Sequence, residues 1–132
     1  MKKCQISLEY MLVFGMVFAL VVAAFSGTWF YYKESKNAND AEEAVAILAN
    51  TADTIYALGN GSMTNVVVNL PYNAQVSAGK NEIVFIISET KSSKIYNAYT
   101  KGPVMIGILP SRSGRFQISV QKLSNGTVKI GD

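Results

Sequence analysis

The chain contains no histidine and only one cysteine, Cys4. Without a second cysteine it cannot form an intrachain disulfide, and without histidine it lacks a Ser-His-Asp triad and the usual zinc ligand sets. Glycine-rich phosphate and dinucleotide motifs and a nucleophile elbow are also missing from the sequence. A folded domain here has to be stabilised by apolar burial, and nothing in the sequence indicates a catalyst or a cofactor.

Charged residues are scarce as well, at 16% of the chain, with 12 basic and 9 acidic side chains. Two of the basic residues, Lys2 and Lys3, stand at the very start. Without them the sequence has ten basic residues against nine acidic ones and no basic cluster. The composition therefore predicts no nucleic-acid partner.

Apolar residues make up 49% of the chain and gather near its start. From Tyr10 to Tyr32 there are 23 consecutive uncharged residues, and about 20 are enough for a helix to cross a bilayer. Because Lys2 and Lys3 precede this run, the positive-inside rule predicts a cytoplasmic N-terminus and an external C-terminal domain. The aromatic residues from Trp29 onward fit either a belt at the outer interface or a packed junction between helix and sheet.

Four zones follow one another: a basic head at 1–4, a hydrophobic helix at 5–32, an amphipathic helical extension at 33–60 and a β-rich segment at 61–132. In the third zone, apolar residues recur at spacings of three and four, as on one helix face. These residues are Ala41, Val45, Leu48, Ala52 and Ile55.

The end of the helical region is marked by Gly59, a natural helix stop. Asn39 followed by Glu42 resembles a capping box, which marks either a new helix start or a bend in one long helix. We expect a nearly continuous helix from about residue 6 to residue 58.

After Gly61 the apolar period becomes two, as in strands. Phe116 and its alternate neighbours predict a half-buried strand over 115–121, and the unbroken apolar run Ile83 to Ile87 predicts a strand covered on both faces. Further strands are predicted at Val66–Leu70, Ile95–Tyr99 and Val104–Leu109. Asn125-Gly126 is the strongest hairpin signal.

Six or seven short strands within about 70 residues are typical of a sandwich or small barrel. The predicted fold class is α+β: a long N-terminal hydrophobic α-helix followed by a small antiparallel β-sandwich or barrel-like domain.

The entrance of the apolar run carries the pattern Gln5-x-Ser7-x-Glu9, preceded by Lys3 and Cys4. The run is longer than the 7–15 residues of a conventional secretory signal. A charge at mid-membrane costs roughly 2.5–3.5 kcal/mol on insertion scales, so an intramembrane carboxylate usually has a specific partner. Glu9 is therefore a candidate for a specific contact.

This pattern resembles the class III signal of euryarchaeal type IV pilin-like proteins. In that family a membrane-embedded prepilin peptidase cuts immediately before the glutamine, and the hydrophobic segment stays on the mature subunit as the filament core. The resemblance implies a leader peptide at 1–4 and these peptidase recognition residues: Lys3, Cys4, Gln5 and Ser7. At the position of Cys4 the family usually has glycine or another small residue, and a leader of four residues is very short.

The resemblance also implies a role for Glu9 in assembly. Cleavage exposes a positively charged amino group on Gln5, which would meet the Glu9 carboxylate of a neighbouring subunit. In a core of low dielectric constant, pairing offsets the desolvation of both charges, whereas an unpaired charge is costly.

The large apolar residues of the run would interlock with neighbouring helices in such a filament. The candidates are Met11, Phe14, Phe18, Val21, Val22 and Phe25. Composition alone fits a lipid-facing anchor equally well, and the pattern at Gln5, Ser7 and Glu9 favours the filament.

Asn60-Gly61-Ser62 and Asn125-Gly126-Thr127 are N-glycosylation sequons in predicted turns. In an exported domain Asn60 and Asn125 are candidate acceptors, which would make the protein a glycoprotein. Turn chemistry alone also explains both Asn-Gly pairs.

These observations predict a structural subunit of an archaeal type IV pilus-like surface filament that is held in the membrane before assembly and acts in adhesion by family analogy. The polymer would be homopolymeric or would contain other pilins, and the subunit would be no enzyme. Two alternatives stay open. One is a secreted surface binding protein cut before Phe25, and the other is a membrane anchor that retains Met1 and never polymerises.

Overall fold

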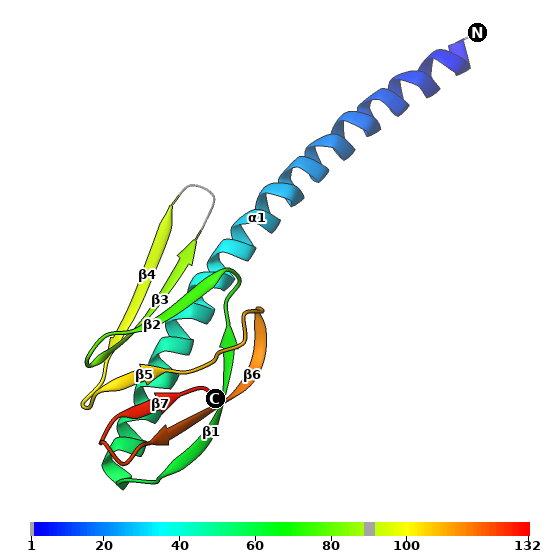
Figure 1. The fold of residues 1–132 in the computed structure, drawn as a ribbon. Helices are drawn as coiled ribbons and strands as arrows, with labels where there is room; N and C mark the ends of the chain where they lie inside the picture. Colours follow the sequence, from blue (N-terminus) through cyan, green and yellow to red (C-terminus); the bar gives the residue numbers. More distant parts are fainter. Residues whose placement is uncertain (1, 89–91) are drawn as a thin grey trace. The chain divides into compact units, whose positions relative to one another are not determined.

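A single long helix opens the structure, which is a computed structural model describing residues 2–88 and 92–132, with side chains from Ser7 onward. The helix, α1, spans Lys2–Leu58 (Figure 1). The expectation of one nearly continuous helix to residue 58 is confirmed. Asn39 and Glu42 lie inside it and start no new helix. The chain divides into two compact units, Met1–Lys36 and Asn37–Asp132.

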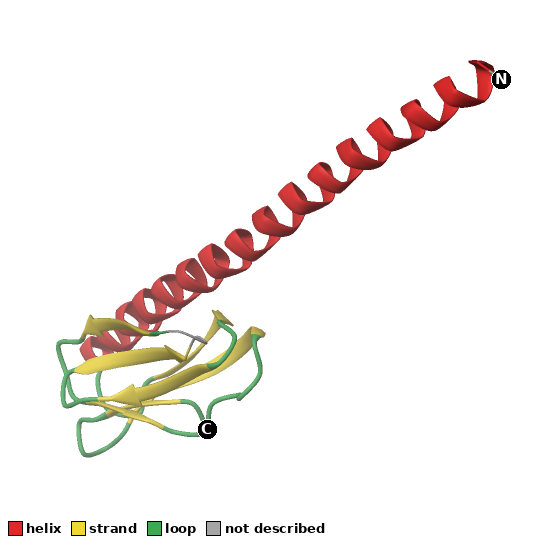
Figure 2. Ribbon diagram, turned by 90° about the horizontal axis from the view of Figure 1, so that it is seen from above, coloured by secondary structure: helices red, strands yellow, loops and turns green. Residues whose placement is uncertain are grey.

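The second unit contains all strands of the described residues, and they lie along the C-terminal part of α1 in Figures 1 and 2. The strands are β1 (Met63–Leu70), β2 (Ala74–Ala78), β3 (Glu82–Ser88), β4 (Ser93–Tyr99), β5 (Val104–Ile106), β6 (Gly114–Lys122) and β7 (Val128–Ile130). They form a four-stranded sheet in the order β1-β6-β7-β5 and a three-stranded sheet in the order β2-β3-β4. The predicted α+β fold class is confirmed.

One hydrophobic core joins the helix to both sheets. From α1 it takes the face that includes Ala44, Leu48 and Ile55, and from the sheets it takes alternate residues such as Phe85 and Val120. All five apolar helix residues predicted from the spacing are buried, at 0–2% exposure. Two further alanines, Ala44 and Ala49, widen the same face, as expected for a helix against a sheet.

Strand β3 differs from the expectation that both its faces are covered. Ile83, Phe85 and Ile87 point into the core and are at most 1% exposed. Val84 and Ile86 point the other way and are only half-buried. The prediction of two covered faces was wrong for this chain by itself, because the described residues cover only one side of the strand.

The β6–β7 hairpin confirms the turn predicted at Asn125-Gly126. Gly126 N–H donates to the Leu123 carbonyl at 3.0 Å, and Leu123 N–H donates to the Thr127 carbonyl at 2.9 Å. Gly126 has a φ of 84°. The connection is therefore a three-residue loop closed by Gly126 in the left-handed region. Asn125, in the same loop, keeps a negative φ.

Strand β5 departs from the antiparallel expectation. It pairs with β7 in parallel, with Val104 opposite Val128, whereas the other described strand pairs are antiparallel. It also ends at Ile106 rather than at the predicted Leu109. Beyond it, Gly107 N–H donates to the Ile130 carbonyl at 2.7 Å, so the chain stays beside β7 without extending the regular strand.

Candidate functional site

The N-terminal half of α1 exposes nearly all of its apolar side chains. Between Leu8 and Tyr32 the large hydrophobic residues are 48–81% exposed. By length and composition this is the one helix of the described residues that is long and apolar enough to cross a membrane, and none of its most apolar stretch is buried within the chain. The segment therefore suits a membrane anchor or a signal segment.

Polar side chains within this stretch satisfy their hydrogen bonds inside the helix. The Ser26 hydroxyl donates to the Val22 carbonyl at 2.9 Å, and the Thr28 hydroxyl donates to the Ala24 carbonyl at 3.0 Å. A hydroxyl that bonds to the preceding turn can enter hydrocarbon without leaving a donor unpaired. The two hydroxyls are therefore compatible with an apolar environment on every side.

The apolar stretch ends at an aromatic residue and a cation. Lys33 Nζ lies 5.9 Å from the centre of the Trp29 ring, one helical turn back. Tryptophan and lysine are residues that anchor helices at the membrane–water interface, with the lysine head turned toward water. This contact was not predicted, although the i, i+4 spacing of Trp29 and Lys33 is visible in the sequence.

The six candidate packing residues share one face of the helix. At 100° per residue they fall within an arc of about 100°. The members of this packing stripe are Met11, Phe14, Phe18, Val21, Val22 and Phe25.

Glu9 lies on the opposite side of the helix, about 170° from the middle of the packing stripe. Its own face continues toward the C-terminus with Met16, Leu20 and Ala23. The carboxylate and the packing stripe therefore cannot meet the same neighbouring helix.

The predicted peptidase recognition residues fall where little can be described. The backbone is helical from Lys2 onward, but the side chains of Lys3, Cys4 and Gln5 lie outside the described residues. Ser7 is exposed on the helix surface. The recognition sequence thus stays a prediction.

The two sequons come together at one end of the second unit. Asn60 Nδ2 donates to the Ser124 carbonyl at 3.5 Å, next to Asn125, and Gly61 N–H donates to the Lys122 carbonyl at 3.0 Å. Both acceptor asparagines are exposed. Sequence alone did not indicate that residues 64 positions apart would share one tip.

Hydrogen bonds also tie the end of α1 to the sheet. Lys122 Nζ donates to the Tyr56 carbonyl at 2.8 Å and lies 4.3 Å from the centre of the Tyr56 ring. A cation at a helix C-terminus compensates the carbonyls that lack helical partners. At the same end, Asp53 Oδ1 accepts from Lys101 N–H at 2.7 Å.

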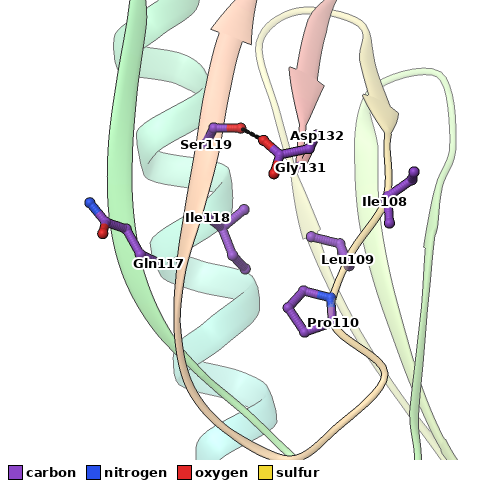
Figure 3. A pocket seen from close by; sticks show the side chains of 8 residues that line it. All are labelled: Ile108, Leu109, Pro110, Gln117, Ile118, Ser119, Gly131 and Asp132. Carbon is purple, nitrogen blue, oxygen red and sulfur yellow. Dashed lines mark hydrogen bonds between the residues drawn. The ribbon is translucent and has the colours of Figure 1, made fainter.

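A shallow cavity of about 240 Å³ lies between β6 and the segment after β5 (Figure 3). Ile118, Leu109 and Pro110 point into it, while Asp132 already accepts a hydrogen bond from the Ser119 hydroxyl at 2.9 Å. Ligand sites usually have about 300–1,000 Å³ and several converging polar groups. Among the described residues there is also no group of three potential metal ligands.

Comparisons with protein-family models, with curated proteins and with solved structures find no match to this chain. The features of the chain that indicate a function are the sequence pattern at Gln5, Ser7 and Glu9 and the geometry of α1.

Proposed function

We propose that the chain is the structural subunit of a surface filament of the type IV pilin kind, polymerised through the N-terminal half of α1. The observation that carries the proposal is an apolar helix segment that is exposed on all sides and is covalently continuous with a separately packed domain. The resemblance at Gln5, Ser7 and Glu9 supports it by indicating prepilin peptidase processing before polymerisation.

The positions of Glu9 and the packing stripe support a polymer over a pair of helices. A helix that is apolar all round requires apolar surroundings on all sides. One neighbour on the packing stripe leaves Glu9 unpartnered, because the two lie on opposite faces. A subunit inside a helical array has neighbours on several sides, so both features are used at once.

Before assembly the same segment holds the precursor in the cell membrane, with Lys2 and Lys3 on the cytoplasmic side and the β-rich unit outside. In the filament the segments leave the lipid and pack against one another. Adhesion is the proposed role of the assembled filament by family analogy.

Replacing Glu9 with glutamine tests the assembly step. The change keeps size and hydrogen-bonding capacity and removes the negative charge that would pair with the amino group of Gln5 in a neighbouring subunit. We expect Glu9→Gln to reach the membrane at the wild-type level and to yield no sheared filaments. The measurement is immunoblotting of membrane and sheared-filament fractions together with negative-stain electron microscopy.

The matched control is Glu43→Gln, which removes a carboxylate from the solvent-exposed face of the same helix. This variant should assemble at the wild-type level. Normal filament yield from Glu9→Gln would rule out the proposed charge pairing, and a loss of filaments in both variants would point to net charge instead of to position.

A further inference from the structure

The outer face of the three-stranded sheet carries a group of apolar side chains that the described residues leave partly or largely exposed. On this outer face Val84 and Ile86 are half-buried, Ile95 is 67% exposed and Tyr99 is 76% exposed. Ile86 and Ile95 are directly opposite each other on adjacent strands. An apolar sheet face exposed to water in a small domain indicates an interaction surface.

Among the described residues that point outward from this face, one side chain is charged. The residues that point outward from β2, β3 and β4 are Gln75, Ser77, Glu82, Val84, Ile86, Ser88, Ser93, Ile95, Asn97 and Tyr99. Glu82 is opposite Tyr99 at one end of the sheet and forms no ion pair with another described residue. A surface that is complementary to this outer face would be mostly uncharged and would carry one cation at the position that faces Glu82.

The outer face of β1 and β6 in the four-stranded sheet has this complementary pattern. Met63 and Val67 are 58% and 47% exposed there. Arg115, opposite Asn69, is exposed at one end and has no ion pair with another described residue. On the neighbouring strand this face also carries Lys129, and the Asp132 carboxylate is bound to Ser119.

We propose that the outer face of β2-β3-β4 in one copy packs on the outer face of β1-β6 in the next copy, with Glu82 facing Arg115. The inference depends on the proposed function, since it concerns copies within the filament. Next to Glu82 on the first face lies Val84, and next to Arg115 on the second face lies Gln117, whose cross-strand partner is Val67. Because two different faces meet, each copy has a free face for the next one, and in a helical array the contact repeats from copy to copy.

The outer face of β2-β3-β4 is too small to bind a free partner tightly. It suits a second copy of the chain that polymerised helices already hold close by. Strands of five, seven and seven residues, about 4.8 Å apart and rising about 3.3 Å per residue, cover roughly 300 Å² per copy. Two such faces bury roughly 600 Å², about half of what a stable independent interface needs. Polymerised helices supply the high effective concentration that makes so small a contact form.

Crosslinking in filaments tests the contact in the full chain. Val67→Cys combined with Asn97→Cys places one thiol on each face at the same level, and a bis-maleimide with a reach of about 10 Å matches the spacing of packed sheets. We expect a ladder of dimers, trimers and longer species on denaturing gels from the double variant. The two single variants and the wild type, whose only cysteine is Cys4, should stay monomeric.

Charge reversal gives a second, independent measurement. In the crosslinking background, Glu82→Arg or Arg115→Glu alone should lower the ladder yield about two- to five-fold, as expected for a contact between exposed charges. The combination Glu82→Arg with Arg115→Glu should restore it. Equal yields in all four proteins would overturn the assigned pairing.

The failure of this contact is distinguishable from the failure of the proposed function. If the double cysteine variant forms filaments but gives no crosslinked ladder, the contact is overturned and the filament proposal stays intact. A wild-type protein that forms no filaments would overturn the proposed function and, with it, this inference.

Discussion

The two halves of α1 are built from similarly apolar residues but place them differently. From Ser7 to Lys36 apolar side chains point in every direction and stay exposed, whereas from Asn37 to Tyr56 most of them gather on one face and are buried there. Leu20 is 71% exposed and Leu48 is fully buried, although both are leucines in the same helix.

Hydrophobic content alone does not decide which part of a helix is buried. In the C-terminal half, acidic and small polar residues such as Glu43 and Asn50 occupy the solvent face, so the apolar arc matches one layer of β-structure. The N-terminal half has no polar face to turn toward water. It therefore suits apolar surroundings, which the described residues do not supply.

Truncating Leu48 in the C-terminal half should have the strongest effect on stability, and truncating Leu20 in the N-terminal half is its control. Leu48→Ala removes a fully buried side chain from the core and should lower the free energy of unfolding of the second unit by about 2–5 kcal/mol. Leu20→Ala removes an exposed side chain and should change it by less than about 0.5 kcal/mol. Thermal unfolding of the detergent-solubilised full chain, followed by near-UV circular dichroism, checks both. Equal shifts from the two substitutions would contradict the division of the helix.

A second substitution in the N-terminal half should affect assembly without affecting the fold. Phe18→Ala removes an aromatic ring from the middle of the packing stripe. If the Phe18 ring is buried between helices, each subunit contact should weaken by up to about 1.5–3 kcal/mol. The expected result is a strongly reduced yield of sheared filaments with unchanged membrane insertion and an unchanged melting temperature. Wild-type filament yield would mean that Phe18 is not packed between neighbouring subunits.

The smallest effect concerns the tie between the end of the helix and the sheet. Lys122→Met keeps the aliphatic stem but removes the hydrogen bond to the Tyr56 carbonyl and the cation over its ring. The free energy of unfolding should fall by about 1–2 kcal/mol. Each kcal/mol lowers the melting temperature of a domain of this size by roughly 4–8 °C. Lys129→Met, a lysine on the outer sheet face, is the control and should shift the melting temperature little. An equal shift in both variants would show that net charge, not the helix end, is responsible.

Much of the fold follows from local patterns in the sequence. The spacing of Ala41, Val45 and Leu48 predicted the buried helix face, and Asn125-Gly126 predicted the hairpin, because helix periodicity and turn chemistry involve only neighbouring residues. Strand β2 was not predicted. Its inward residues Ala74 and Ala78 are small, so its alternation has little hydrophobic contrast.

The pairing of strands that are distant in the chain was harder to predict from the sequence than local structure. The parallel alignment of β5 with β7 and the single covered face of β3 depend on how distant segments meet, which periodicity does not record. In the candidate site, the sequence indicated both Glu9 and the packing stripe. Only a continuous helix places them on opposite faces.

Mass spectrometry of the native N-terminal peptide decides whether the chain is processed before Gln5 and keeps its apolar segment. The proposed function predicts a mature chain that begins at Gln5, with the apolar segment retained. A chain that begins at Phe25 would mean that this segment is a cleaved signal. A chain that retains Met1 would mean an unprocessed anchor, and either result would contradict the account.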